Sequence, residues 1–275
     1  MSCLPDVSGA DPRLTFDDFA AGYAPGADRQ VVRGITGPWA RGRVTALLGP
    51  NGSGKSTLLR AALGQLRDTS GDVRLGADDS RRMSAAKRAR LVAYLPQRSG
   101  VRFAFTVRQV VAMGRFGLQT GDEPAVERAL QRFGVADRAG DVFQELSGGQ
   151  QRRVLLARTF AQADHDGAAA LLADEPTDGL DLKHVEHAMT ALRELAHGPQ
   201  RLAVVVVLHD LNLAARFADD AWLLHEGRCV AQGEIDAVLE PSRLATVYGL
   251  PLRRVALDPA AGASSPTVLI PVPSG

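Results

Sequence analysis

A glycine-rich string from Gly49 to Thr57 has the residue types and spacing of a phosphate-binding loop. It fits the pattern G-x-x-x-x-G-K-[ST] and lies between an apolar segment and the apolar residues Leu58 to Leu63. Its glycines let backbone N–H groups turn toward phosphate oxygens, and a helix that begins here adds the partial positive charge of its N-terminus. We expect Lys55 to reach the β- and γ-phosphates of a nucleotide and Ser56 to hold Mg²⁺. The expected nucleotide-binding residues of this string are Gly49, Pro50, Asn51, Gly52, Ser53, Gly54, Lys55, Ser56 and Thr57.

Two adjacent carboxylates, Asp174 and Glu175, follow the apolar segment Ala169 to Ala173. If that segment is a strand of a parallel sheet, both carboxylates lie at its carboxyl edge, where such folds bind ligands. Asp174 suits Mg²⁺ through water, and Glu175 can polarise or orient an attacking water as a general base. The pair could also be a solvated start of the turn before Pro176. The phosphate loop elsewhere in the chain favours the catalytic interpretation.

Nearly all-apolar segments along the chain predict strands buried on both faces of a parallel sheet. These segments are Val44 to Leu48, Leu91 to Leu95, Ala169 to Ala173, Leu202 to Leu208 and Ala221 to Leu224. Helical patterns lie between them, so the sequence predicts a parallel α/β core. Shorter strands are expected at Leu14 to Phe16 and around Val31 to Ile35.

The segment from about 103 to 163 has no strong strand pattern and predicts an all-helical insertion in this core. The expected helices are one that Thr106 caps and that carries Val107, Val110, Val111 and Met113, a second over about Glu123 to Phe133 that Gly134 ends, and a third from Gly149 to about Gln162.

Composition and charge limit the class of protein. The 275 residues can form one large α/β domain or two small ones, and 45% hydrophobic and 23% charged residues are typical of a globular chain. We expect a single domain over residues 12–257 and a C-terminal tail over 258–275, in which Thr267 to Ile270 forms an edge strand unless the tail is loose. The formal net charge of +1 argues against a basic nucleic-acid coat, so we expect no nucleic-acid partner.

Cysteine usage and hydropathy predict a cytosolic chain. Cys3 and Cys229 are far apart in the sequence, as expected of free thiols in a reducing compartment. No apolar run approaches the roughly 18 residues of a membrane helix. The segment Met1 to Pro12 has neither the basic nor the apolar region of a secretory signal. Any membrane role must therefore come through a partner.

The string Leu146-Ser147-Gly148-Gly149-Gln150 completes an ordered set of motifs. Phosphate loop, Gln97, LSGGQ, the two carboxylates, Asp181 and His209 follow one another in an order that resembles the ABC ATPases, and the resemblance covers about Leu14 to Leu252. It implies a P-loop NTPase fold, with a mostly parallel sheet and flanking helices, an N-terminal antiparallel β part and an inserted helical subdomain.

The resemblance assigns the signature string to a nucleotide bound by a second subunit. Ser147, Gly148, Gly149 and Gln150 would open a helix whose free N–H groups face that subunit's γ-phosphate. The serine could also be an ordinary helix cap, and the two roles are compatible. The resemblance further implies that Gln97 contacts Mg²⁺ and water, and that His209 contacts the γ-phosphate. By themselves the two could be an ordinary loop residue and a structural histidine.

Two further positions take roles from the resemblance. Asp181 resembles the loop that couples two active sites, and it could equally cap the helix Leu182 to Ala196. Tyr23 stands where the family stacks an aromatic ring on adenine, although the Pro25-Gly26-Ala27 loop after it is longer than usual. The chain departs from the family at Asp178-Gly179, where Ser-Ala is common.

Local strings resemble importers of iron chelates and cobalamin. They are Phe105 to Arg115, His209 to Asp219 and Val247 to Pro251, and the features most like heme importers are Phe103 to Thr106, Gln162 to Gly167 and Val268 to Val272.

The resemblance implies a homodimer of ATPase subunits that binds two MgATP, with Ser56, Gln97 and Asp174 at each Mg²⁺. It also implies two membrane-spanning permease subunits, a substrate-binding protein in the same complex, and a peripheral place on the cytoplasmic face of the membrane. We rank heme first, ferric siderophores second and cobalamin third; a soluble ABC ATPase of iron–sulfur assembly is the alternative class.

Overall fold

The computed structural model describes residues 12–24, 30–98, 100–101, 103–118, 122–256 and 267–272. Cys3, most of the segment Met1 to Pro12 and the Pro25-Gly26-Ala27 loop lie outside these residues, so expectations about them stay predictions. None of the helices in the described ranges combines the length and apolarity that crossing a bilayer requires.

A six-stranded sheet forms the centre of the fold. Its strands, in spatial order, are β10 (Arg228–Glu234), β9 (Asp220–His225), β3 (Arg43–Leu48), β8 (Ala203–Val207), β7 (Ala170–Asp174) and β6 (Val92–Leu95). All neighbours pair in parallel except β10 and β9, which pair antiparallel. Every residue of β7 and β8 is buried, as the all-apolar pattern predicts.

A second sheet forms the N-terminal antiparallel part, which the resemblance implies. Its spatial order is β2 (Gln30–Ala40), β1 (Pro12–Gly22), β4 (Asp68–Leu75) and β5 (Asp78–Asp79). Phe16 and Trp39 from this sheet pack edge to face, and both also contact Trp222 of β9. These rings join the two sheets in one apolar core.

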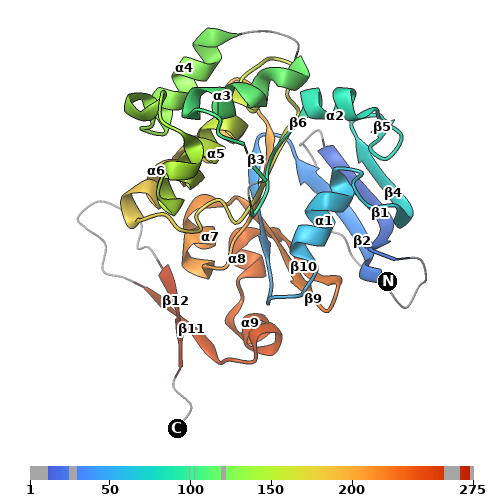
Figure 1. The fold of residues 1–275 in the computed structure, drawn as a ribbon. Coiled ribbons are helices and arrows are strands. Elements are labelled where there is room, and N and C mark those ends of the chain that lie inside the picture. The colour runs from blue at the N-terminus through green and yellow to red at the C-terminus, as the bar shows by residue number, and fades with distance from the viewer. Residues whose placement is uncertain are drawn as a thin grey trace.

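Helices surround the central sheet (Figure 1). Those outside the insertion are α1 (Lys55–Ala62), α2 (Ala85–Leu91), α6 (Leu182–His197), α7 (Leu211–Phe217), α8 (Ile235–Val238) and α9 (Pro241–Tyr248). The strand expected from Leu91 begins one residue later, because Leu91 ends α2.

The expected helical insertion is present between β6 and β7 (Figure 1). It contains α3 (Val107–Ala112), the 3₁₀ segments η2 (Met113–Leu118), η3 (Ala136–Arg138) and η4 (Phe143–Glu145), and the helices α4 (Glu123–Arg132) and α5 (Gly148–Ala163). Thr106 caps α3 and Ser147 caps α5, each through a reciprocal capping box. The first helix is shorter than predicted, since Met113 already belongs to η2.

The C-terminal segment forms a small sheet of its own. β11 (Leu252–Ala256) pairs antiparallel with β12 (Thr267–Pro271), apart from the two larger sheets. Leu269 is buried, and its backbone bonds to Asn212 of α7. Of the two alternatives for Thr267 to Ile270, the structure shows the strand, and this part of the expected tail packs on the domain.

Candidate nucleotide-binding and catalytic site

The phosphate loop joins the end of β3 to the start of α1, as the sequence predicts. Gly54 precedes α1 with a φ of 104°, and a Cβ there would lie 2.5 Å from a methyl group of Val32. Gly49 is buried against the carbonyl of Leu224, and a side chain there would overlap that carbonyl. Only glycine fits either position. No atom of the described residues lies within 4 Å of the Cβ that Gly52 lacks, so in this part of the chain the loop stays open on that side.

Lys55 lies inside the loop with only 6% of its surface exposed. Its Nζ donates hydrogen bonds to the carbonyl oxygens of Gly49 at 2.7 Å and Pro50 at 2.9 Å. Burial lowers the pKa of Lys55, and the nearby carboxylates of Glu175 and Asp174 oppose that shift. The loop thus holds a cation at the place where phosphates would bind.

Asp174, at the end of β7, fits a magnesium site. Its side chain is fully buried, Oδ1 accepts a hydrogen bond from Ser56 Oγ at 3.1 Å, and Oδ2 has no hydrogen-bond partner among the described residues. Burial raises the pKa of Asp174, and the Ser56 hydrogen bond partly offsets this. A hydroxyl beside a buried carboxylate oxygen without a partner is an oxygen donor set that Mg²⁺ can use.

Glu175 is held by side chains from two other segments. His209 Nε2 lies 2.7 Å from Glu175 Oε1, and the Gln97 amide also hydrogen bonds to this carboxylate. Burial acts to raise the pKa of Glu175, but the hydrogen bonds from His209 and Gln97 outweigh it and leave the pKa lowered. Glu175 is therefore ionised at neutral pH and can accept a proton.

Arg152 of α5 lies at the centre of this cluster, and the motif search missed it. Its buried guanidinium donates to the carbonyl oxygens of Pro96, Gln97, Asp174, Glu175 and Pro176. Glu175 has a φ of 52°, which is a left-handed conformation that a residue with a side chain rarely adopts. Arg152 fixes the backbone of Glu175 and the Gln97 loop in one place.

The signature residues and Asp181 lie apart from this cluster. Ser147 and Gln150 hydrogen bond to each other at the start of α5, and Gly148 and Gly149 form the first turn of that helix. Asp181 accepts hydrogen bonds from His184 and caps α6, so the capping role is present. Within the described residues, Ser147 and Asp181 hydrogen bond to residues three positions away and not to the phosphate loop.

Tyr23 stands at the outer side of the phosphate loop. Its side chain is 59% exposed, and its hydroxyl lies 3.2 Å from Thr57 Oγ1 and within hydrogen-bond distance of Arg60. Because more than half of the residue is exposed, stacking of its ring on adenine stays a prediction.

A family model described as ABC transporter matches residues 32–178. The chain belongs to the ABC transporter family. Its members among curated proteins include the hemin import ATP-binding protein HmuV of Pseudomonas fluorescens (strain Pf0-1), which is 45% identical over 76% of this chain and 83% of its own length. The cobalamin import ATP-binding protein BtuD of Halobacterium salinarum (strain ATCC 29341 / DSM 671 / R1) is 43% identical over 83% of this chain, and the match spans 57% of that relative.

Solved structures of other ABC proteins share the fold. A protein described as a metal-chelate type ABC transporter, in an inward-facing conformation, superposes with a TM-score of 0.77 at 25% identity, over 95% of this chain and 98% of its own. The cbiO1 protein of Clostridium perfringens, part of the ABC transporter complex cbiONQ, gives a TM-score of 0.71 at 28% identity, over 86% of this chain and 94% of its own.

Replacing Arg152 with lysine tests the carbonyl cluster of this ABC protein. Lysine keeps the charge but cannot serve five carbonyls, so we expect kcat for ATP hydrolysis to fall by about tenfold or more because Glu175 is misplaced. The matched control is Arg153→Lys, since Arg153 is the next residue of α5 and donates to the carbonyls of Phe133 and Gly134, outside the carbonyl cluster. Steady-state kinetics compare the two variants, and equal kcat values would contradict the positioning role.

Replacing Asp174 with asparagine tests how much the buried, ionised carboxylate lowers the free energy of unfolding. Because its pKa is raised in the fold, Asp174 favours folding when protonated, and this contribution is lost as pH rises through the folded pKa. At pH 7 without nucleotide we expect Asp174→Asn to unfold at a higher temperature than the wild type, with a difference that shrinks in acid. MgATP at 100 times its Kd should add about 2.7 kcal/mol to the wild type and much less to the variant. A less stable variant at pH 7 would refute this.

Proposed function

We propose that this chain is the ATP-binding and ATP-hydrolysing subunit of an ABC importer. The observation that carries the proposal is the convergence of Lys55, Asp174, Glu175 and His209 at the carboxyl ends of β3, β7 and β8, which are neighbours in the central sheet. A cation for phosphates, an oxygen donor set for Mg²⁺ and an ionised base lie together there. This is the equipment that phosphoryl transfer to water requires.

In the proposed mechanism the loop amides and Lys55 bind the phosphates of ATP. Ser56 and Asp174 would hold Mg²⁺, with Gln97 as a third contact, and when bound the ion would supply positive charge that offsets the negative charge of the phosphates. Glu175 accepts a proton from the attacking water, while His209 orients this carboxylate and contacts the γ-phosphate. Arg152 keeps Glu175 in place throughout.

The second half of each nucleotide site comes, in this proposal, from a second copy of the chain. The start of α5 at Ser147 offers N–H groups to an anion, and the phosphate loop of the same chain does not occupy them. Asp181 is exposed, and Leu182 beside it has 82% of its surface exposed. An apolar side chain this exposed next to a charged cap favours a protein partner at this surface.

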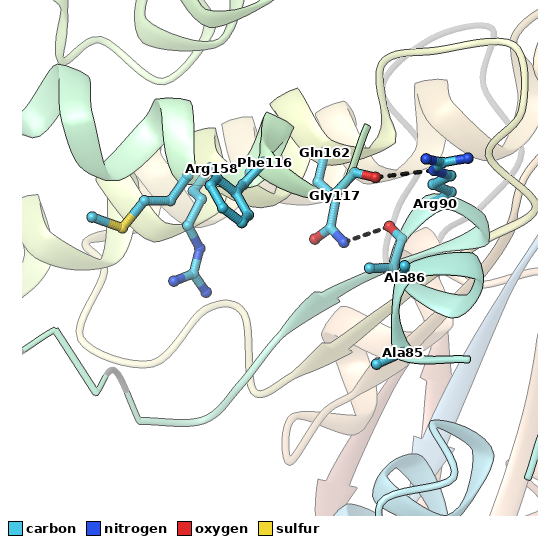
Figure 2. A pocket seen from close by; sticks show the side chains of 10 residues that line it. Ala85, Ala86, Arg90, Phe116, Gly117, Arg158 and Gln162 are labelled. Atoms are coloured by element: carbon cyan, nitrogen blue, oxygen red, sulfur yellow. Dashed lines mark hydrogen bonds between the residues drawn. The ribbon is translucent and has the colours of Figure 1, made fainter. Parts of the chain in front are cut away.

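A groove on the helical side fits a membrane-spanning permease subunit. It has a volume of about 480 Å³ and lies between α2, η2 and α5, with Phe116 89% exposed at its edge (Figure 2). Gln162 on its lining bonds to the carbonyls of Ala89 and Val92, which connects the groove to β6 and the Gln97 loop that follows it. Two such subunits, and through them a substrate-binding protein, would place the chain at the cytoplasmic face of the membrane.

Heme is the proposed cargo. Relatives named as hemin import proteins in several bacteria are 41–45% identical to this chain, which supports the ranking from the local strings. The relatives named for cobalamin import and the metal-chelate transporter structure favour the same importer group. Ferric siderophores and cobalamin are the second and third candidates. A soluble ATPase of iron–sulfur assembly would have no use for a groove that fits a membrane subunit.

Replacing Glu175 with glutamine tests the proposed base and the dimer. Hydrolysis should slow by about 10²- to 10⁴-fold, and an ATP-bound dimer should accumulate in size-exclusion chromatography. Glu226→Gln is the control, because the Glu226 carboxylate is exposed in the turn between β9 and β10. Lys55→Ala should instead weaken ATP binding by about tenfold or more. Normal turnover in Glu175→Gln, or unchanged affinity in Lys55→Ala, would count against the mechanism.

The cargo is tested in the complete complex of this chain with its permease in lipid vesicles. We expect ATP-dependent uptake of heme, measured by its absorbance inside the vesicles, and loss of that uptake with Glu175→Gln subunits. Uptake of cobalamin or a ferric siderophore in place of heme would reassign the cargo without affecting the proposed ATPase.

A further inference from the structure

Tyr248, in the closing string Val247 to Pro251, contacts the phosphate loop and does not belong to any of the nucleotide-binding motifs. It is the last residue of α9, and its hydroxyl oxygen lies 3.0 Å from the backbone nitrogen of Gly49. The two residues are far apart in sequence, so this contact belongs to the tertiary fold. It joins the C-terminal segment to the first residue of the loop.

The N–H of Gly49 needs a partner of this kind. Gly49 is buried and is the first residue after β3, where pairing with β9 ends at Leu48. A buried backbone N–H without an acceptor is costly, and the phenol of Tyr248 supplies the acceptor. The carbonyl of the same glycine accepts a hydrogen bond from Lys55. Gly49 is therefore held through its N–H by Tyr248 and through its carbonyl by the lysine expected at the phosphates.

The position of the phenol is itself fixed. The Tyr248 ring packs against the main apolar core, and burial raises the pKa of its hydroxyl while the Gly49 hydrogen bond acts in the opposite direction. Gly249 ends α9 with a φ of 66°, and the chain then enters β11. Two hydrogen bonds between the side-chain amide of Asn212 in α7 and the backbone of Leu269 in β12 hold the β11–β12 pair on the domain. The segment that carries Tyr248 is therefore held in place by packing and hydrogen bonds.

We propose that Tyr248 is a positioning residue for ATP binding, which acts by holding Gly49, and through it the entrance of the phosphate loop, in the binding conformation. The proposal rests on the proposed ATPase function and adds to it a residue outside the family motifs. Tyr248 does not touch the reacting atoms, so its loss should affect nucleotide affinity and leave the chemical step intact.

The test compares Tyr248→Phe with the wild type and with Thr246→Val. Phenylalanine keeps the ring and removes the acceptor, whereas Thr246→Val removes an exposed hydroxyl of the same helix that donates to the carbonyl of Ser242. We expect Tyr248→Phe to raise KM for ATP by about three- to tenfold with kcat nearly unchanged. In nucleotide-free protein, amide hydrogen exchange should be faster at Gly49 and its neighbours and unchanged elsewhere. The control should match the wild type in both measurements.

Unchanged exchange at Gly49, or faster exchange with an unchanged KM, would overturn the proposal. Faster exchange throughout the chain with a lower melting temperature would also overturn it, because that result describes a general loss of stability. If the wild type binds no ATP, the proposed function fails, and the exchange measurement, which needs no nucleotide, still decides whether Tyr248 holds Gly49.

Discussion

The geometry of the catalytic cluster depends on the buried guanidinium of Arg152. Two segments that are separate in the sequence, the loop at Pro96 and Gln97 and the stretch from Asp174 at the end of β7 to Pro176, direct carbonyl oxygens at this one group. The planar guanidinium has five N–H donors and can donate a hydrogen bond to each of these carbonyls, which no other side chain can do. The left-handed backbone of Glu175 persists because the surrounding hydrogen bonds determine it. The signature helix and the catalytic carboxylate are thereby parts of one rigid arrangement.

Much of the architecture could be predicted because its signals are local. The apolar strands β3, β7 and β8, the caps Thr106 and Ser147 and the phosphate loop all come from short stretches whose physics does not depend on distant residues. β4 and β10 were not predicted, since Asp68–Leu75 is mostly polar, Arg228–Glu234 mixes polar and apolar residues, and neither has a clean alternation. They become strands because a neighbouring strand supplies their hydrogen bonds, which is tertiary information.

In the candidate site, too, residues with local sequence signals could be predicted and residues that depend on tertiary contacts could not. The sequence indicated Lys55, Ser56, Asp174 and Glu175 correctly as neighbours, because each follows a buried parallel strand or begins the helix after it. Arg152 left a weaker signal, as a charged residue on the face of α5 that buries Leu155, Leu156 and Thr159. The roles of Ser147, Asp181 and Tyr23 toward a nucleotide stay predictions, since they depend on a second chain or a ligand.

The hydrogen bonds from Lys55 to the carbonyls of Gly49 and Pro50 have a thermodynamic consequence. They stiffen the loop before any ligand arrives, so the conformational entropy of ordering it is lost during folding and not during association. An incoming triphosphate then meets a preorganised receptor, and little of its intrinsic affinity is spent on rearrangement.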